Sequence, residues 1–198
     1  MKHKKGFTLI ELLVVIAIIG ILASVVLSSL SSARTTAQYT KVASDLRSAE
    51  LAFNLLRNQY GCWPQERSNA PGNWGDCISF SGTTNNPTVA SLIASGELGL
   101  SQHLATPPSW PFFDAEWVYD NDNDIVTTPC ADGFSIAGVM LVILNHATYE
   151  QFRNLNQIFD PHEDPATAEA RGCGKIIWNS NNINGLGALG FVLSRDQR

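Results

Sequence analysis

The chain opens with an apolar run that predicts a membrane-spanning helix. Residues 7–30 are apolar or small except for Thr8, Glu11 and three serines. At about 1.5 Å per residue, a helix of roughly this length crosses a hydrocarbon layer of about 30 Å. Lys2, Lys4 and Lys5 precede the run, and basic residues of this kind stay on the cytoplasmic side. The rest of the chain would therefore face outward.

After residue 30 the apolar positions become periodic, which predicts that the same helix continues as an amphipathic one. Larger apolar residues and alanine recur at spacings of three and four, as one buried helical stripe requires. They are Tyr39, Val42, Leu46, Ala49, Phe53 and Leu56. Gly61 suits a C-terminal cap and Pro64 cannot continue a helix. We expect one long helix over residues 7–59.

The pattern after residue 60 predicts a globular domain over residues 60–198. A long stretch rich in Gly, Ser, Asn and Pro covers residues 62–111, with a short helix near 89–93. Four strand-like stretches follow, rich in aromatic and branched residues and bounded by turn residues. They cover residues 116–119, 134–144, 175–178 and 188–193, and an amphipathic helix is expected over 149–159. The predicted fold is α+β, with the long N-terminal helix packed on a small antiparallel β-sheet.

Length and charge narrow the class of protein. The 198 residues are enough for one domain with a sizeable core plus the apolar segment. The net charge is −5, and the part after the three N-terminal lysines is more acidic still. Binding of nucleic acid depends on Lys and Arg that neutralise phosphates, so we expect no nucleic-acid partner.

Four cysteines, all after the apolar run, predict two disulfides. Cys62, Cys77, Cys130 and Cys173 contain no C-x-x-C pair, which removes the usual zinc and redox spacings. Disulfides suit an oxidising compartment, and free thiols in a cytosolic core are the alternative. Of three possible pairings, Cys62–Cys77 and Cys130–Cys173 are favoured because each would close a contiguous loop.

Glu11 distinguishes the apolar run from an ordinary secretory signal. "LASVVLSS" could pass as a signal-peptidase site, but that interpretation does not account for a carboxylate inside an apolar segment. Such a charge is costly in a membrane and needs a partner, and its own apolar run holds no cation.

"KGFTLIELLVVIAIIGILA", residues 5–23, resembles the leader and N-terminal helix of type IV pilins and type II secretion pseudopilins. The resemblance implies a leader over residues 1–6, cleavage between Gly6 and Phe7 by a prepilin peptidase, and N-methylation of Phe7. It also implies that Glu11 pairs with the N-terminal amine of a neighbouring subunit. Many family members carry a proline shortly after this segment, where this chain has Ser28.

The resemblance implies a structural subunit rather than an enzyme, without a cofactor. The subunit would lie in the inner membrane with one span and then enter a periplasmic or cell-surface filament. Its partners would be itself, other pilins, the prepilin peptidase and an inner-membrane assembly platform. The alternatives are a pseudopilin of a secretion or DNA-uptake system and, from another class, a membrane-anchored periplasmic enzyme.

Two further motifs have the spacing of ligand-binding loops. Asp120, Asp122 and Asp124 alternate as the first ligands of calcium loops do, although no EF-hand spacing follows. The alternative interpretation is a solvated hairpin turn. "GLGALG", residues 185–190, has dinucleotide-loop spacing but lies too near the C-terminus for the helix and acid that such a site requires.

Overall fold

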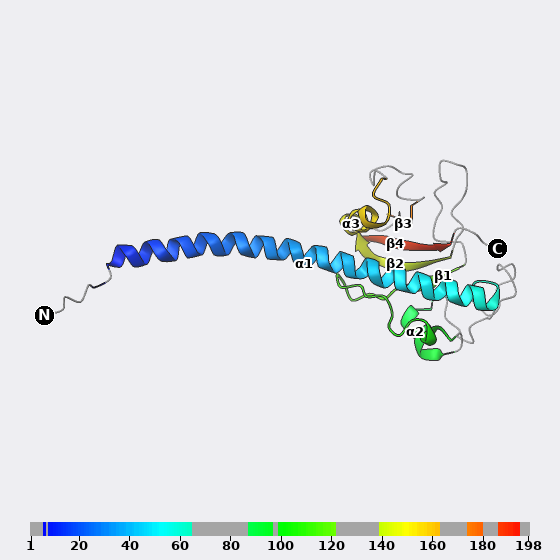
Figure 1. Ribbon diagram of the computed structural model, residues 1–198. Coiled ribbons are helices and arrows are strands. Elements are labelled where there is room, and N and C mark those ends of the chain that lie inside the picture. Colours follow the sequence, from blue (N-terminus) through cyan, green and yellow to red (C-terminus); the bar gives the residue numbers. More distant parts are fainter. Residues whose placement is uncertain are drawn as a thin grey trace. The chain divides into compact units, whose positions relative to one another are not determined.

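The computed structural model describes residues 6, 8–64, 87–96, 99–121, 139–162, 174–179 and 186–194. The chain divides into two compact units, Met1–Gln38 and Tyr39–Arg198. The elements are α1 (Leu9–Tyr60), α2 (Val89–Ser95), the 3-10 helix η1 (Leu100–Gln102), β1 (Val118–Asp120), β2 (Val139–Thr148), α3 (Tyr149–Phe159), β3 (Ile176–Asn179) and β4 (Leu186–Ser194) (Figure 1).

The long helix predicted from the sequence is present and ends where its stop signals lie. α1 continues without interruption through Ser28, where many family members have a proline. Gly61 follows it with φ of +80°, a backbone conformation that glycine adopts without strain. Its N–H donates to the carbonyl of Arg57 at 2.7 Å, which closes the last turn.

The four strands form one antiparallel sheet, as predicted, and their order in the sheet is β1-β2-β4-β3. Leu141 of β2 pairs with Phe191 of β4, and Ile177 of β3 pairs with Gly190. β2 extends to Thr148, four residues beyond its predicted end. An irregularity in register between Ile143 and Ala147 lets the strand resume its pairing with β4. The first part of the predicted strand, residues 134–138, lies outside the described residues.

The main core of the second unit lies between one face of the sheet and two helices. All six positions of the predicted α1 stripe are buried. Phe53 of α1 stacks on Tyr119 of β1, with ring centroids 5.0 Å apart. Burial of an aromatic pair in this geometry adds about 0.5–1.5 kcal/mol to the effect of the buried area. The periodic half of α1 is therefore held by tertiary packing.

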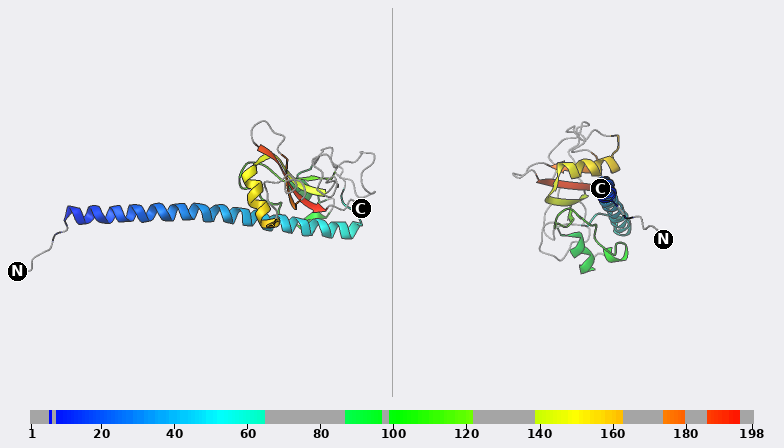
Figure 2. Two further views of the ribbon diagram at one scale, coloured as in Figure 1. Left: turned by 90° about the horizontal axis from the view of Figure 1, so that it is seen from above. Right: turned by 90° about the vertical axis from the view of Figure 1, so that its left-hand side faces the viewer.

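Helix α3 has the bounds predicted from its periodicity and lies beside β3 and β4 (Figures 1 and 2). Thr148 and Gln151 form a capping box at its N-terminus, which satisfies two backbone N–H groups. Phe152 stacks on Trp178 at 6.2 Å and Phe159 contacts Phe191 at 5.0 Å. These rings attach α3 to the sheet. Helix α2 also forms where it was expected, and it extends two residues further than predicted.

The opposite face of the sheet carries a second, smaller cluster that accounts for one glycine of "GLGALG". Met140, Val142, Ile177 and Val192 are buried there. A Cβ on Gly190 would lie 2.7 Å from Cγ1 of Ile177, so no side chain fits at this position without a shift. Residues 186–190 are part of β4, which agrees with the rejection of a dinucleotide loop.

A polar link joins α1, the end of α3 and β3. Glu50 of α1 accepts a hydrogen bond from Nζ of Lys175 at 2.6 Å. The backbone N–H groups of Lys175 and Ile176 donate to Asp160, which follows α3, at 2.7 and 3.2 Å. The start of β3 is therefore held from two sides.

Candidate functional site

The first unit presents an apolar helix whose large side chains are all exposed within the single chain. From Leu9 to Leu30 their exposed fractions range from 46% at Val15 to 79% at Leu9. A helix that is apolar around its whole circumference is not stable in water and requires lipid or protein around it. α1 is long and apolar enough to cross a membrane. This surface is the first candidate functional site.

Glu11 lies in the first turn of α1 and is held by Thr8. One of its carboxylate oxygens accepts hydrogen bonds from the backbone N–H and the hydroxyl of Thr8, both at 2.8 Å. The backbone N–H of Glu11 donates to the Thr8 hydroxyl oxygen at 3.3 Å. This reciprocal arrangement is a capping box. Thr8 therefore gives the Glu11 carboxylate a local hydrogen-bond partner, although the apolar run holds no cation. The capping box fixes the carboxylate at the N-terminal end of the helix.

The predicted cleavage position follows an exposed residue. Gly6 is exposed, and a Cβ built on it meets no atom within 4 Å. Phe7, the predicted new N-terminus, lies outside the described residues. A larger residue at position 6 would therefore meet no steric obstacle in this chain.

The serines within the apolar segment satisfy their own hydroxyl groups. Ser24 donates to the carbonyl of Ile21 at 2.7 Å, and Ser29 donates to the carbonyl of Val25 at 3.0 Å. A hydroxyl without a partner would be costly in lipid or in a dry protein interface. Because both hydroxyls bond within α1, the helix can enter either environment without losing hydrogen bonds.

Comparison with known proteins addresses the same segment. Residues 1–27 match the family described as the prokaryotic N-terminal methylation motif. The type IV major alpha-pilin of Moraxella bovis is 37% identical over 100 residues, which cover 50% of this chain and 61% of that protein. The type II secretion system core protein G of Klebsiella pneumoniae is 39% identical over 64 residues, which cover 32% of this chain and 46% of that protein.

The N-terminal part of the chain is therefore similar to that of type IV pilins and type II secretion pseudopilins. A third relative, the type IV wide pilus major component of Thermus thermophilus, is 55% identical over 63 residues, 30% of this chain and 48% of that protein. The chain spans less than two thirds of the length of each of these relatives. No solved structure matches. The apolar helix and the motif fit a pilin that is anchored in the inner membrane and then forms a filament.

The other predicted sites lie in the second unit of the chain. Cys62 is disulfide-bonded. Cys77, Cys130 and Cys173 lie outside the described residues, so the two predicted pairs stay predictions.

The calcium candidate is described only in part. Asp120 is 1% exposed at the end of β1, so the alternative interpretation as a solvated turn is wrong for this residue. Asp122 and Asp124 lie outside the described residues, and calcium binding stays a prediction.

A loop that the sequence analysis did not single out forms a second candidate site. Asp45 of α1 accepts hydrogen bonds from the Ser109 hydroxyl at 2.6 Å and the Ser109 backbone N–H at 3.1 Å. Lys41 donates to the same carboxylate oxygen at 2.7 Å. The Ser109 carbonyl in turn accepts from the Trp117 indole at 3.3 Å. Loop 105–117 is therefore fastened to α1.

The environment of Asp45 changes its acidity. Partial burial by itself would raise the pKa of Asp45, but the hydrogen bonds from Lys41 and Ser109 outweigh it and hold that pKa below its ordinary value. Asp45 therefore remains ionised over a wider pH range than a solvated aspartate does.

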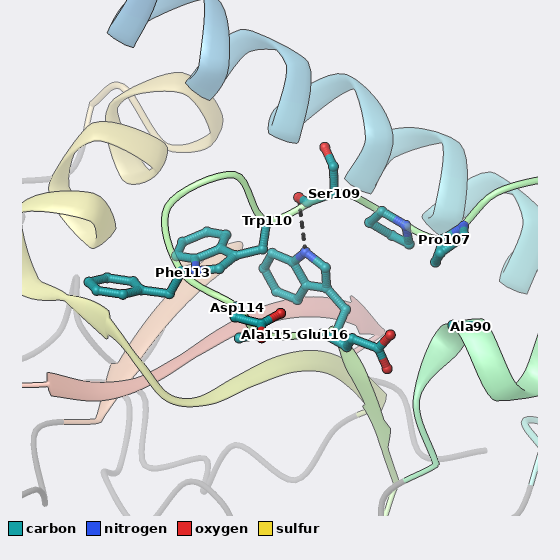
Figure 3. A pocket seen from close by; sticks show the side chains of 10 residues that line it. Ala90, Pro107, Ser109, Trp110, Phe113, Asp114, Ala115 and Glu116 are labelled. Carbon is teal, nitrogen blue, oxygen red and sulfur yellow. Dashed lines mark hydrogen bonds between the residues drawn. The ribbon is translucent and has the colours of Figure 1, made fainter.

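Beside the hydrogen bonds between Asp45 and Ser109, loop 105–117 encloses one side of an open pocket of 370 Å³ (Figure 3). Its lining is aromatic and acidic, with prolines and small residues completing it. The lining residues are Ala90, Pro107, Pro108, Ser109, Trp110, Phe113, Asp114, Ala115, Glu116 and Trp117. Of the described tryptophans, Trp63, Trp110 and Trp117 are buried and Trp178 is half-buried. The only sequence signal for the pocket is "PPSWPFFDAEW", which combines stiff prolines, aromatic rings and acids within eleven residues.

Proposed function

We propose that this chain is the structural subunit of a type IV pilus or a related filament, assembled by packing of its N-terminal helix. The observation that carries the proposal is the apolar half of α1, which is exposed all round within one chain. In the inner membrane, lipid covers this surface. In the filament, the same surface packs against the helices of other copies and other pilins.

Processing precedes assembly in this proposal. A prepilin peptidase removes residues 1–6, and Phe7 becomes the N-methylated end of the mature chain. The family match to residues 1–27 supports this step. The exposure of Gly6 also supports it, because a Cβ built on this residue meets no described atom within 4 Å.

Glu11 supplies the charge that aligns subunits. In the filament its carboxylate receives the Phe7 amine of the adjacent subunit, and pairing in trans compensates the charge in an apolar environment. The capping box leaves one carboxylate oxygen without a bond to Thr8, and this oxygen is free to accept the amine. An inner-membrane assembly platform would drive extraction from the lipid.

The test is the variant Glu11→Gln in a strain without a wild-type copy. Glutamine keeps the shape and most of the hydrogen bonding with Thr8 but removes the charge. We expect normal membrane insertion and cleavage, with a sharp fall in sheared filaments relative to total subunit. Intact-mass analysis of the assembled protein provides the control and should show a chain beginning at N-methyl Phe7. Normal filament yield from the variant, or retention of Met1–Gly6 on assembled protein, would remove the basis of the proposal.

A second candidate is a pseudopilin that forms a short periplasmic filament. The similarity to type II secretion system core protein G favours it. Imaging of sheared surface filaments, followed by identification of their main component, separates the two. Long filaments composed of this chain indicate a pilus, and their absence in a strain with active secretion indicates a pseudopilus.

The proposed biochemistry is polymerisation rather than catalysis. A membrane-anchored periplasmic enzyme is the competing class. It would keep Met1–Gly6 and an unmethylated Phe7, which the same mass analysis detects.

A further inference from the structure

The pocket formed by loop 105–117 combines the two features that recognise a guanidinium group. Asp114 and Glu116 are exposed on its edge, and neither carboxylate has a hydrogen bond or ion pair with the described residues. Phe113, which also lines the pocket, is 41% exposed. A planar arginine side chain can stack on an aromatic face while it donates to carboxylates. None of the lining residues is basic.

Trp110 gives a second, independent indication that the pocket has an occupant. Its ring lines the pocket and is 7% exposed. Its indole N–H is buried and finds no acceptor in the part of the chain that the structure describes. A buried donor without a partner costs about 1–3 kcal/mol. An occupant that placed an acceptor oxygen at this N–H would remove this cost.

Arg34 has the matching chemistry. It is the only cation between Phe7 and Thr40, and it is exposed on α1. Within the described residues no hydrogen bond or ion pair of Arg34 is found. Ser31 lies three residues before it, on the same helical face, and carries an acceptor hydroxyl. If α1 is covered by other subunits, the Arg34 charge leaves water and needs a counter-charge.

We propose that in the filament Arg34 of one copy enters the pocket of a neighbouring copy, where its guanidinium pairs with the carboxylates of Asp114 and Glu116. This inference rests on the proposed function. The contact is heterologous, because each copy offers a cation at one place and a pocket at another, and such contacts generate open helical chains. Such a contact therefore suits a filament, and it would fix the register in which the apolar helices of neighbouring copies pack.

The other described cations are less suitable because most have partners in their own chain. Lys41 pairs with Asp45 and Lys175 with Glu50. Arg47 and Arg57 each lie over an aromatic ring, 5.0 and 5.3 Å from the centroid. Arg153, exposed on α3, is the remaining cation and provides a matched control.

Cysteine crosslinking in assembled filaments tests the contact. The full chain carrying both Arg34→Cys and Glu116→Cys should give a ladder of disulfide-linked multimers on non-reducing gels, because each copy links to two others. The control carrying Arg153→Cys and Glu116→Cys should remain monomeric. Filaments of normal yield without the ladder would overturn the inference, as would an equal ladder from the control.

Charge reversal gives a second readout that does not depend on cysteine chemistry. Arg34→Glu and Glu116→Arg should each lower filament yield about tenfold or more, because each places like charges in contact. The double variant should recover most of the yield, and Arg153→Glu should match the wild type. Failure of the double variant to recover would overturn the contact while wild-type filaments keep the proposed function intact. Absence of wild-type filaments would overturn both.

Discussion

The Asp45 carboxylate is the point at which loop 105–117 depends on α1, so its removal should loosen the loop. Asp45→Ala removes the acceptor of three hydrogen bonds, two from Ser109 and one from Lys41. Hydrogen bonds to charged groups contribute about 1.5–3 kcal/mol, and an exposed ion pair within a helix contributes about 0.3–0.5 kcal/mol. Because Asp45 is only partly buried, water replaces some of these hydrogen bonds in the variant and reduces the loss of stability. We expect the free energy of unfolding to fall by about 2 kcal/mol.

The pH dependence of this loss has a definite sign. Because the folded-state pKa of Asp45 is lowered, its contribution is fully present above the unfolded value of about 3.9. The contribution decreases as pH falls through the lowered folded-state pKa, where the carboxylate is protonated in both states. The difference between wild type and Asp45→Ala should therefore be largest near neutral pH and should shrink below about pH 4.

The assay is urea unfolding of the full chain in non-ionic detergent at pH 7 and at pH 3, followed by tryptophan fluorescence. Trp117, whose indole bonds to the Ser109 carbonyl, reports on the loop. Lys41→Ala is the matched control, and it should change stability by no more than about 0.5 kcal/mol because its side chain is 63% exposed. Equal losses from Lys41→Ala and Asp45→Ala would refute the reasoning. So would a loss from Asp45→Ala that stays the same at both pH values.

Three further predictions concern the second unit. Gly190→Ala should lower the free energy of unfolding by about 1–3 kcal/mol, because its Cβ would lie 2.7 Å from Ile177, and urea unfolding measures the change. Asn156→Leu should raise stability by about 1–3 kcal/mol in the same assay, because both polar side-chain atoms of Asn156 are buried without a hydrogen-bond partner among the described residues; a loss of stability would contradict this. Non-reducing peptide mapping should show Cys62–Cys77 and Cys130–Cys173, and a Cys62–Cys173 crosslink would contradict this pairing. Closure of a 15-residue loop by a disulfide is worth about 3 kcal/mol in the chain-entropy model, so reduction should destabilise the domain measurably.

Several elements were predictable because their causes are local. The apolar run, the period of the α1 stripe and the stop at Gly61 lie in neighbouring residues, and α1 forms from Leu9 to Tyr60 accordingly. Helix α3 has its predicted bounds because Thr148 and Gln151 mark its start and apolar spacing marks its face. The family motif is also contiguous, so the sequence alone was enough to predict Gly6 as a cleavage position and Glu11 as an assembly residue.

The second candidate site was decided only by tertiary structure. Asp45 and Ser109 are 64 residues apart in the chain, and neither position carries a pattern that predicts their 2.6 Å hydrogen bond. The extension of β2 beyond residue 144 depends on its pairing with β4 after an irregularity in register, and the burial of Asp120 depends on the packing around β1. Helical periodicity and membrane insertion act through the nearest residues, so sequence displays them directly. Contacts across the fold depend on the path of the whole chain, and only the assembled domain brings Ala90 of α2 to the same pocket as loop 105–117.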